Sequence, residues 1–97
     1  MKPAERDALI QSYFAEDLEL LRAKGHDYAG QEDALGNLRR FGLLGIIVRL
    51  SDKFSRIEQF AKSGDISVKG ESIADTLRDI RNYSFLAQIF FEGKDHE

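Results

Sequence analysis

Apolar side chains recur every three or four residues through most of this chain, which is the spacing of one face of an α-helix. The pattern first occurs in residues 4–23, and Pro3 suits the first turn of a helix there. Its apolar stripe consists of Ile10, Phe14, Leu18 and Leu21. We predict an amphipathic helix that forms one wall of a helical bundle.

Residues 24–31 interrupt this pattern with two glycines and several polar side chains, which indicates a loop or a helix break. Lys24, His26 and Tyr28 lie in this segment. Loops held by rigid elements often carry binding residues, so these three are candidates for contact with a base or a phosphate. A solvated connector is the alternative interpretation.

The spacing of Leu35 and Leu38 predicts a short helix in residues 32–41. Asn37 lies among its polar positions, where it is either a contact to a base edge or an ordinary surface residue. Gly42 and Gly45 bracket the start of the next helix. Glycine there allows a close approach of backbones.

Residues 42–62 repeat apolar side chains at the helical period and carry charged side chains elsewhere around the axis. Four of the charged residues share a face: Arg49, Asp52, Lys53 and Arg56. One interpretation is a solvated face held by ion pairs such as Asp52 with Arg56. The other is a cationic lining for phosphates.

Residues 63–70 are a short polar connection, after which residues 71–91 again show helical spacing. The two flanking helices can therefore fold back as an antiparallel pair. Four polar residues of the second helix share a face: Glu71, Asp75, Asp79 and Asn82. Packing would set this carboxylate-rich face beside the cationic one.

The carboxylate face of residues 71–91 continues into apolar positions, since the same direction past Asn82 reaches Phe85 and Ile89. The carboxylates therefore lie in line with buried surface, where like charges need a compensating cation. Magnesium is a natural candidate because it prefers oxygen ligands. Arg78, Arg81 or the arginines of the preceding helix could compensate instead.

The length of 97 residues indicates a single domain, and the helical patterns predict an all-α architecture of about four helices spanning residues 1–97. A domain of this size buries only a modest core, and oligomerisation is a common remedy. The chain has no cysteine, which excludes disulfides and thiolate metal sites. The apolar run 43–48 is too short to span a membrane, and no signal core precedes it. A cytosolic location is the default expectation.

The formal net charge is −3, which disfavours nucleic acid as a partner. It does not exclude a nucleotide, because a divalent cation can lie between an acidic site and a polyphosphate.

Three blocks of the sequence resemble a known family. They are Lys24-x-His26-Asp27-Tyr28, the run from Gly45 to Arg56 that contains Arg49-x-x-Asp52-Lys53-x-x-Arg56, and Glu71-x-x-x-Asp75-Thr76-Leu77-x-Asp79-x-x-Asn82-Tyr83. In this order they resemble the nucleotide-modification-associated family of phages and bacteria. That family looks like a branch of the all-α NTP pyrophosphatases, which include MazG and the dimeric dUTPases.

The resemblance implies a MazG-like helical bundle that forms a homodimer or homotetramer in the cytosol of a bacterial or phage-infected cell. It also implies an enzyme that splits a nucleoside triphosphate into a monophosphate and pyrophosphate, in nucleotide-pool control or phage nucleotide modification. Magnesium is the implied cofactor, with manganese as a substitute.

Carried over by position, the resemblance assigns roles to individual residues. The expected metal ligands are Asp52, Glu71, Asp75 and Asp79. The expected catalytic residues are Asp52, Glu71, Asp75 and Lys53. The expected substrate contacts are Lys24, His26, Tyr28, Asn37, Arg49, Arg56 and Asn82. Two positions depart from the family pattern, because Arg49 replaces the first of two paired glutamates and Ser72 stands where a second adjacent glutamate is common.

A competing interpretation is a non-catalytic helical module that binds nucleotide, or that pairs with another protein through residues 85–91. The two interpretations differ in their response to magnesium plus a triphosphate, which should stabilise only the enzyme.

Overall fold

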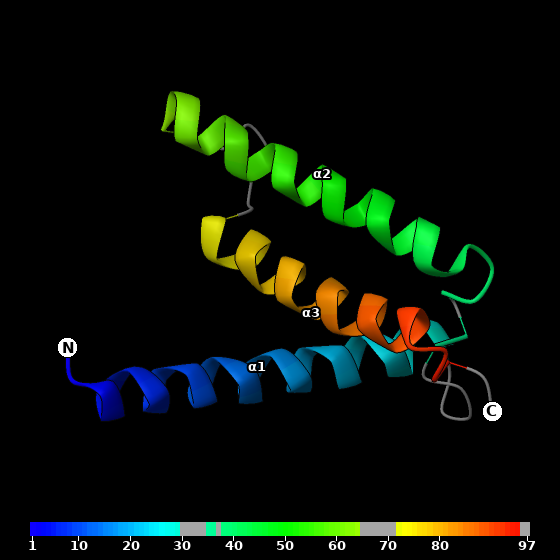
Figure 1. Ribbon diagram of the computed structural model, residues 1–97, viewed down its shortest axis with the longest axis horizontal. Coiled ribbons are helices and arrows are strands. Elements are labelled where there is room, and N and C mark those ends of the chain that lie inside the picture. The colour runs from blue at the N-terminus through cyan, green and yellow to red at the C-terminus, as the bar shows by residue number, and fades with distance from the viewer. Residues whose placement is uncertain (30–34, 37, 65–71, 96–97) are drawn as a thin grey trace. The chain divides into compact units, whose positions relative to one another are not determined.

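The structure is a computed structural model that describes residues 1–29, 35, 36, 38–64 and 72–95, with the backbone alone for residues 25–29. Within these residues it contains three helices and no strand: α1 (Pro3–Ala29), α2 (Gly42–Ser63) and α3 (Ile73–Phe91) (Figure 1). The prediction of an all-α fold is confirmed. The predicted number of about four helices is not, since three are present in the described residues.

The chain divides into two compact units, each of which is described by itself. The first unit, Met1–Gly36, contains α1, and the second, Asn37–Glu97, contains α2 and α3. The predicted site residues of the two C-terminal helices therefore lie in one unit.

Helix α1 is longer than the hydrophobic pattern indicates. It continues to Ala29, so the break predicted from residue 24 onward is wrong for residues 24–29. A single glycine inside a helix costs about 1 kcal/mol relative to alanine but removes no backbone donor, and here it does not end the helix. On the predicted apolar stripe, Ile10 and Phe14 are 56% and 51% exposed.

The short helix predicted for residues 32–41 is absent where the structure describes that segment. Residues 35, 36 and 38–41 form turns, and the Gly42 N–H donates to the Leu38 carbonyl at 2.9 Å. Gly42 has a φ of +57°, which L side chains rarely adopt. A helix of ten residues with an internal glycine gains little from propensity alone, so turn geometry prevails.

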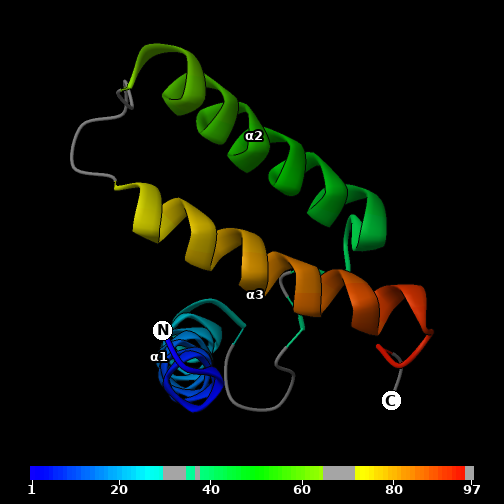
Figure 2. The same ribbon diagram turned by 60° about the vertical axis from the view of Figure 1, so that its left-hand side comes forward.

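Helices α2 and α3 run in opposite directions and lie side by side, as Figures 1 and 2 show from two directions. Ile46 of α2 is only 1% exposed, and Thr76 and Asn82 of α3 are buried too. The predicted antiparallel pair is therefore observed. Two of these three buried side chains are polar.

Defined caps fix the ends of both helices at the connection between them. Gly64 ends α2 with a φ of +73° and donates its N–H to the Phe60 carbonyl at 2.7 Å. At the start of α3, the Ser72 hydroxyl accepts from the Asp75 N–H at 3.1 Å, and the Ser72 N–H donates to the Asp75 carboxylate at 3.3 Å. This reciprocal capping box places the first helical residue at Ile73.

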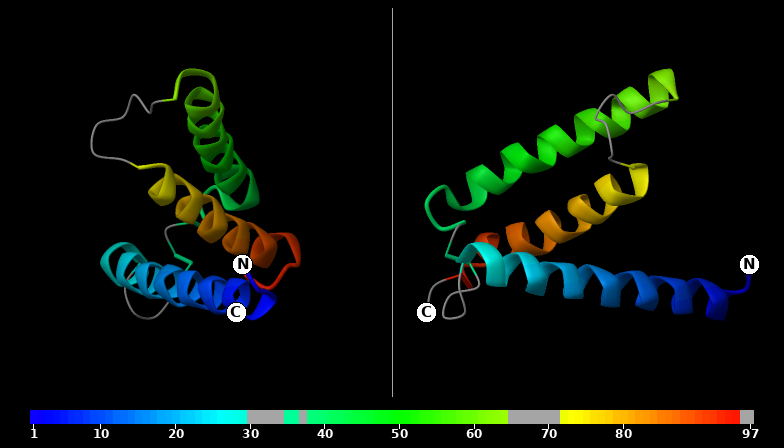
Figure 3. Two further views of the ribbon diagram at one scale, coloured as in Figure 1. Left: turned by 90° about the vertical axis from the view of Figure 1, so that its left-hand side faces the viewer. Right: turned by 180° about the vertical axis from the view of Figure 1, so that it is seen from behind.

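Several large apolar side chains of α2 and α3 are exposed. Figure 3 shows the backbone of these helices from two further sides. Leu44 and Val48 of α2 are 71% and 61% exposed, and Phe91 of α3 is 78% exposed. Among the described residues, the C-terminal end of α3 is therefore left partly uncovered. In the parts of the chain that the structure describes, no helix has both the length and the apolar character required to cross a membrane.

Candidate functional site

A salt bridge joins the two predicted polar faces across the α2–α3 interface. Lys53 Nζ lies 3.0 Å from Asp79 Oδ2, and the two side chains are only 15% and 19% exposed. The sequence places both residues on their predicted stripes, and the antiparallel packing turns these parts of the stripes toward each other. The interface thus contains a charged pair that is largely shielded from water.

Arg49 lies one helical turn before Lys53 and contacts Tyr83, one turn after Asp79. Its guanidinium carbon is 5.9 Å from the centre of the Tyr83 ring, and its Nη1 lies 3.5 Å from the Tyr83 hydroxyl. This is a cation–π contact with a long hydrogen bond. Tyr83 was not among the predicted site residues, although its position four residues after Asp79 places it on the same face of the helix.

Asp52 is paired within its own helix. Its Oδ2 lies 3.4 Å from Arg56 Nη2, and the Asp52 side chain is 62% exposed whereas that of Arg56 is 25% exposed. This is the ion pair expected from a solvated helical face. An exposed pair of this spacing contributes little to stability, on the order of 0.3–0.5 kcal/mol.

Asp75 has a structural role at the start of α3. Besides the capping box with Ser72, its Oδ1 lies 2.8 Å from Arg78 Nη2. Hydrogen bonding to the Ser72 side chain, followed by that to the Ser72 backbone and the nearby Arg78 charge, holds the pKa of the Asp75 carboxyl below its ordinary value of 3.8. The ionised carboxylate is therefore the favoured form.

Two polar side chains of α3 lie in the interior. Thr76 is fully buried, and its hydroxyl donates to the Ser72 carbonyl at 3.2 Å. Asn82, predicted as a substrate contact, is 7% exposed. Its side chain is therefore largely shielded from solvent, three residues after Asp79 on the same helix.

The donor chemistry of the predicted metal ligands suits a divalent cation, because carboxylate oxygens are the ligands magnesium prefers. In the described residues, however, no three His, Cys, Asp or Glu side chains are grouped closely enough to hold a metal ion. Asp52, Asp75 and Asp79 each have a basic partner, namely Arg56, Arg78 and Lys53. These carboxylates can bind a cation only if their basic partners move away from them.

Four predicted site residues fall outside what the structure describes: Glu71 and Asn37 entirely, and His26 and Tyr28 in their side chains. Lys24 is exposed on α1 and belongs to the N-terminal unit. The structure therefore brings together residues from two of the three sequence blocks, with Lys53 and Asp79 in direct contact.

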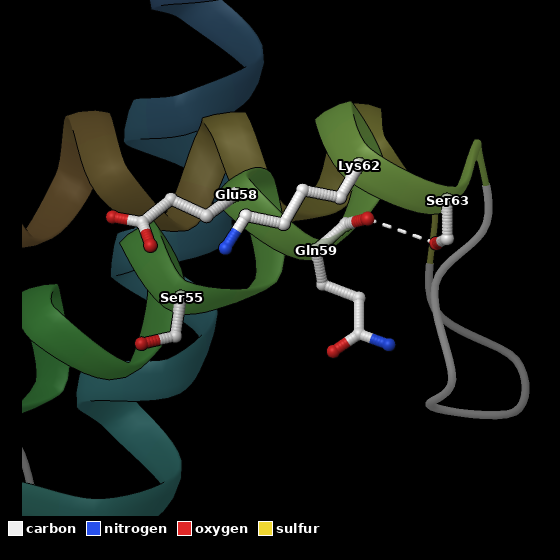
Figure 4. Close-up of a pocket in the computed structure, with 5 residues that line it drawn as sticks. All are labelled: Ser55, Glu58, Gln59, Lys62 and Ser63. Atoms are coloured by element: carbon white, nitrogen blue, oxygen red, sulfur yellow. Dashed lines mark hydrogen bonds between the residues drawn. The ribbon is translucent and has the colours of Figure 1, made fainter.

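A shallow depression of about 280 Å³ lies elsewhere, on the last turns of α2 (Figure 4). Its lining residues are Ser55, Glu58, Gln59, Lys62 and Ser63. The hydrogen bond drawn there, from the Ser63 hydroxyl to the Gln59 carbonyl at 2.8 Å, is internal to the helix. None of the predicted site residues lines this depression.

Comparison of the chain with models of protein families, with curated proteins and with solved structures finds no match. Any functional assignment consequently rests on the sequence blocks and on the contacts between α2 and α3. Of these contacts, the salt bridge between Lys53 and Asp79 is the one that links the two blocks directly.

Proposed function

We propose that this protein is a magnesium-dependent nucleoside triphosphate pyrophosphohydrolase, with manganese able to replace magnesium. The observation that carries the proposal is the contact between Lys53 and Asp79, at 3.0 Å across the α2–α3 interface. A cationic row and a carboxylate row on adjacent helices are what such an enzyme needs for a metal–triphosphate complex. The resemblance of the sequence blocks to the all-α NTP pyrophosphatases supports the same function.

The basic residues of α2 act on the phosphates in this proposal. Three basic residues lie about one helical turn apart on α2: Arg49, Lys53 and Arg56. Apolar residues occupy positions between them in the sequence. The three basic residues bind the β- and γ-phosphates and neutralise the charge that develops on the departing pyrophosphate. Arg49 is the most readily available of them, because its observed partner is the neutral phenol of Tyr83.

The acidic residues Asp52, Glu71, Asp75 and Asp79 hold the divalent cation in this proposal. When bound, the cation supplies an activated water and neutralises phosphate charge. The water oxygen forms the new bond to the α-phosphorus, and the bond from this phosphorus to the bridging oxygen breaks. Pyrophosphate leaves, and a site carboxylate accepts the proton of the water.

Recognition of the base is assigned to four residues outside the helix pair and to one residue of α3. Lys24, His26 and Tyr28 and the amides of Asn37 and Asn82 are the proposed contacts to the nucleoside. A homodimer or homotetramer in the cytosol of a bacterial or phage-infected cell is part of the proposal, and the exposed apolar residues of α2 and α3 support self-association.

One observation favours a second candidate, a non-catalytic helical module. Asp52, Asp75 and Asp79 have their charge compensated by side chains of the chain itself. Carboxylates compensated in this way stabilise a helix pair without any metal. The two candidates make opposite predictions for catalysis.

The test is pyrophosphate release from a panel of ribo- and deoxyribonucleoside triphosphates with magnesium, measured for the wild type, Asp79→Asn and Glu58→Gln. Asp79→Asn retains the shape of the side chain but removes a charged ligand, so we expect the rate to fall roughly 10- to 100-fold. Glu58 is an exposed acid of α2 outside the site, and its variant should match the wild type. Equal background rates in all three proteins would exclude the enzyme and favour the module.

A further inference from the structure

Arg49 differs from the other two basic residues of the proposed phosphate site in the partner that it contacts. Lys53 and Arg56 each form a salt bridge with an aspartate, whereas no carboxylate of the described residues pairs with Arg49. Its guanidinium carbon lies 5.9 Å from the centre of the Tyr83 ring on α3. We propose that Tyr83 is a positioning residue that holds Arg49 in place for the phosphates. The inference rests on the proposed function and adds a residue to its phosphate site.

An aromatic ring attracts a cation without neutralising it. The attraction comes from the quadrupole of the ring, which has no net charge, so the guanidinium of Arg49 keeps its positive charge. A carboxylate in the place of Tyr83 would also attract Arg49, but it would repel a phosphate brought to the same site. Tyr83 therefore restricts the position of Arg49 and leaves its charge for an anion.

The Arg49 guanidinium also retains most of its hydrogen-bonding capacity. An arginine side chain carries several N–H donors in a planar fork that matches the oxygens of a phosphate. Within the described residues, the Arg49 side chain donates only to the Tyr83 hydroxyl, and this hydrogen bond is long at 3.5 Å. The other donors can therefore bind phosphate oxygens while the contact with the ring persists.

The position of the pair on the helices explains why such support matters. Arg49 is exposed, whereas Tyr83 is half-buried. An exposed arginine without a contact samples many rotamers, and a ligand that binds it must first order it. The ring limits this freedom before the ligand arrives. Loss of the ring should therefore weaken phosphate binding, although the phosphates contact Arg49 and not Tyr83.

The first experiment measures the affinity for inorganic tripolyphosphate without metal, by calorimetry at low ionic strength, where charge attraction is least screened. Tyr83→Leu removes the ring, so we expect its affinity to be about two- to fivefold lower than that of the wild type, the range of an exposed cation–π contact. Tyr83→Phe keeps the ring and should bind like the wild type. Phe85→Leu removes a ring from an exposed position of the same helix and should leave the affinity unchanged.

Two results of this experiment would overturn the inference. One is wild-type affinity in Tyr83→Leu, and the other is an equal loss of affinity in Tyr83→Phe and Tyr83→Leu. Helical circular dichroism checks that each variant is folded. If Tyr83→Leu lacks the wild-type spectrum, Tyr83→Met, which also has no ring, takes its place.

The second experiment separates positioning of Arg49 from general support of the helix pair. It measures tripolyphosphate binding by Arg49→Met and by the double variant Arg49→Met/Tyr83→Leu. If Tyr83 acts through Arg49, loss of the ring lowers the affinity only when Arg49 is present. Lys62→Met removes a positive charge from an exposed position of α2 and should bind like the wild type. An equal loss of affinity on removal of the ring in the Arg49→Met background would overturn the inference.

Pyrophosphate release separates this inference from the proposed function. A wild type that hydrolyses nucleoside triphosphates, with no effect of Tyr83→Leu on tripolyphosphate binding, would overturn the positioning role and leave the enzyme standing. A wild type that does not hydrolyse them, but whose tripolyphosphate affinity depends on Tyr83 through Arg49, would exclude the enzyme and support the anion site. A wild type that does not bind tripolyphosphate would overturn the inference whether or not it releases pyrophosphate.

Discussion

At the scale of single residues, the acids that were predicted to share a metal ion have different surroundings. Asp52 forms the intrahelical pair with Arg56 that the spacing predicts, whereas Asp79 reaches across to the other helix. Asp75 belongs to a capping box. That role was missed because the helix was expected to begin at residue 71, which placed Ser72 inside it rather than at its N-cap.

The capping box gives Asp75 a testable pH dependence. The pKa of its carboxyl is lower in the folded chain than its ordinary value of 3.8, so its ionised form stabilises the fold. That contribution is fully present above pH 3.8 and is lost as the pH falls through the folded pKa. We expect the wild type to melt above Asp75→Asn at neutral pH, with the difference shrinking below pH 3.8, as thermal unfolding by circular dichroism would show.

Ser72→Ala is the companion variant for this prediction. It removes the hydroxyl that lowers the pKa of Asp75 most, and it should cost about 1 kcal/mol through loss of the cap. Its loss of stability on acidification should begin at the same pH as in the wild type, but it should be smaller and should be complete at a higher pH. A constant difference between wild type and Asp75→Asn at every pH would contradict this account of Asp75.

At the scale of helices, the start of α2 depends on a close contact at Gly45. A Cβ atom added there would lie 2.6 Å from the Cβ of Phe41, which is fixed to the backbone and cannot move aside. Overpacking of this kind costs about 1–3 kcal/mol. The sequence predicted a close approach of backbones at Gly42 and Gly45, whereas the nearest atoms at Gly45 belong to the Phe41 side chain and Gly42 has no atom this close.

Gly45→Ala should therefore lower the melting temperature, although alanine normally stabilises a helix by about 1 kcal/mol relative to glycine. We expect a net loss of about 1 kcal/mol, or roughly 4–8 °C for a chain of this size. Ser51→Ala, at an exposed position of the same helix, should show no loss in the same thermal unfolding experiment. A more stable Gly45→Ala variant would mean that Phe41 does not constrain this turn.

At the scale of the whole molecule, α2 carries a group of exposed apolar side chains that the proposed oligomer would cover. Leu44, Ile47 and Val48 follow one another at helical spacing and are 71%, 48% and 61% exposed. Contiguous exposed apolar side chains commonly mark interaction sites. The proposed homodimer or homotetramer gives these residues a partner.

Val48→Glu should shift the protein toward the monomer, because it places a charge within this surface. Sedimentation velocity at several concentrations would measure the change. Gln59→Glu adds a charge at an exposed polar position of α2 and should leave the oligomer intact. If the Val48→Glu variant sediments with the same mass as the wild type at all concentrations, this face of α2 is not the interface.

The sequence by itself determined that the chain is helical, where α2 and α3 lie to within a few residues, and that these helices form an antiparallel pair. These features follow from local periodicity and a short connection, which need no distant contacts. Two local predictions were wrong in the described residues: the helix break at residues 24–29 and the short helix before Gly42. Local propensity is a weak guide to whether such short segments are helical.

Only the tertiary structure decided which charged residues meet. Asp52 and Lys53 are neighbours in sequence, yet one side chain is mostly exposed and the other lies against Asp79 between the helices. The rotation of each helix about its own axis sets that difference, and residue spacing alone does not determine this rotation. Helical spacing defines a face, but packing determines what the face contacts.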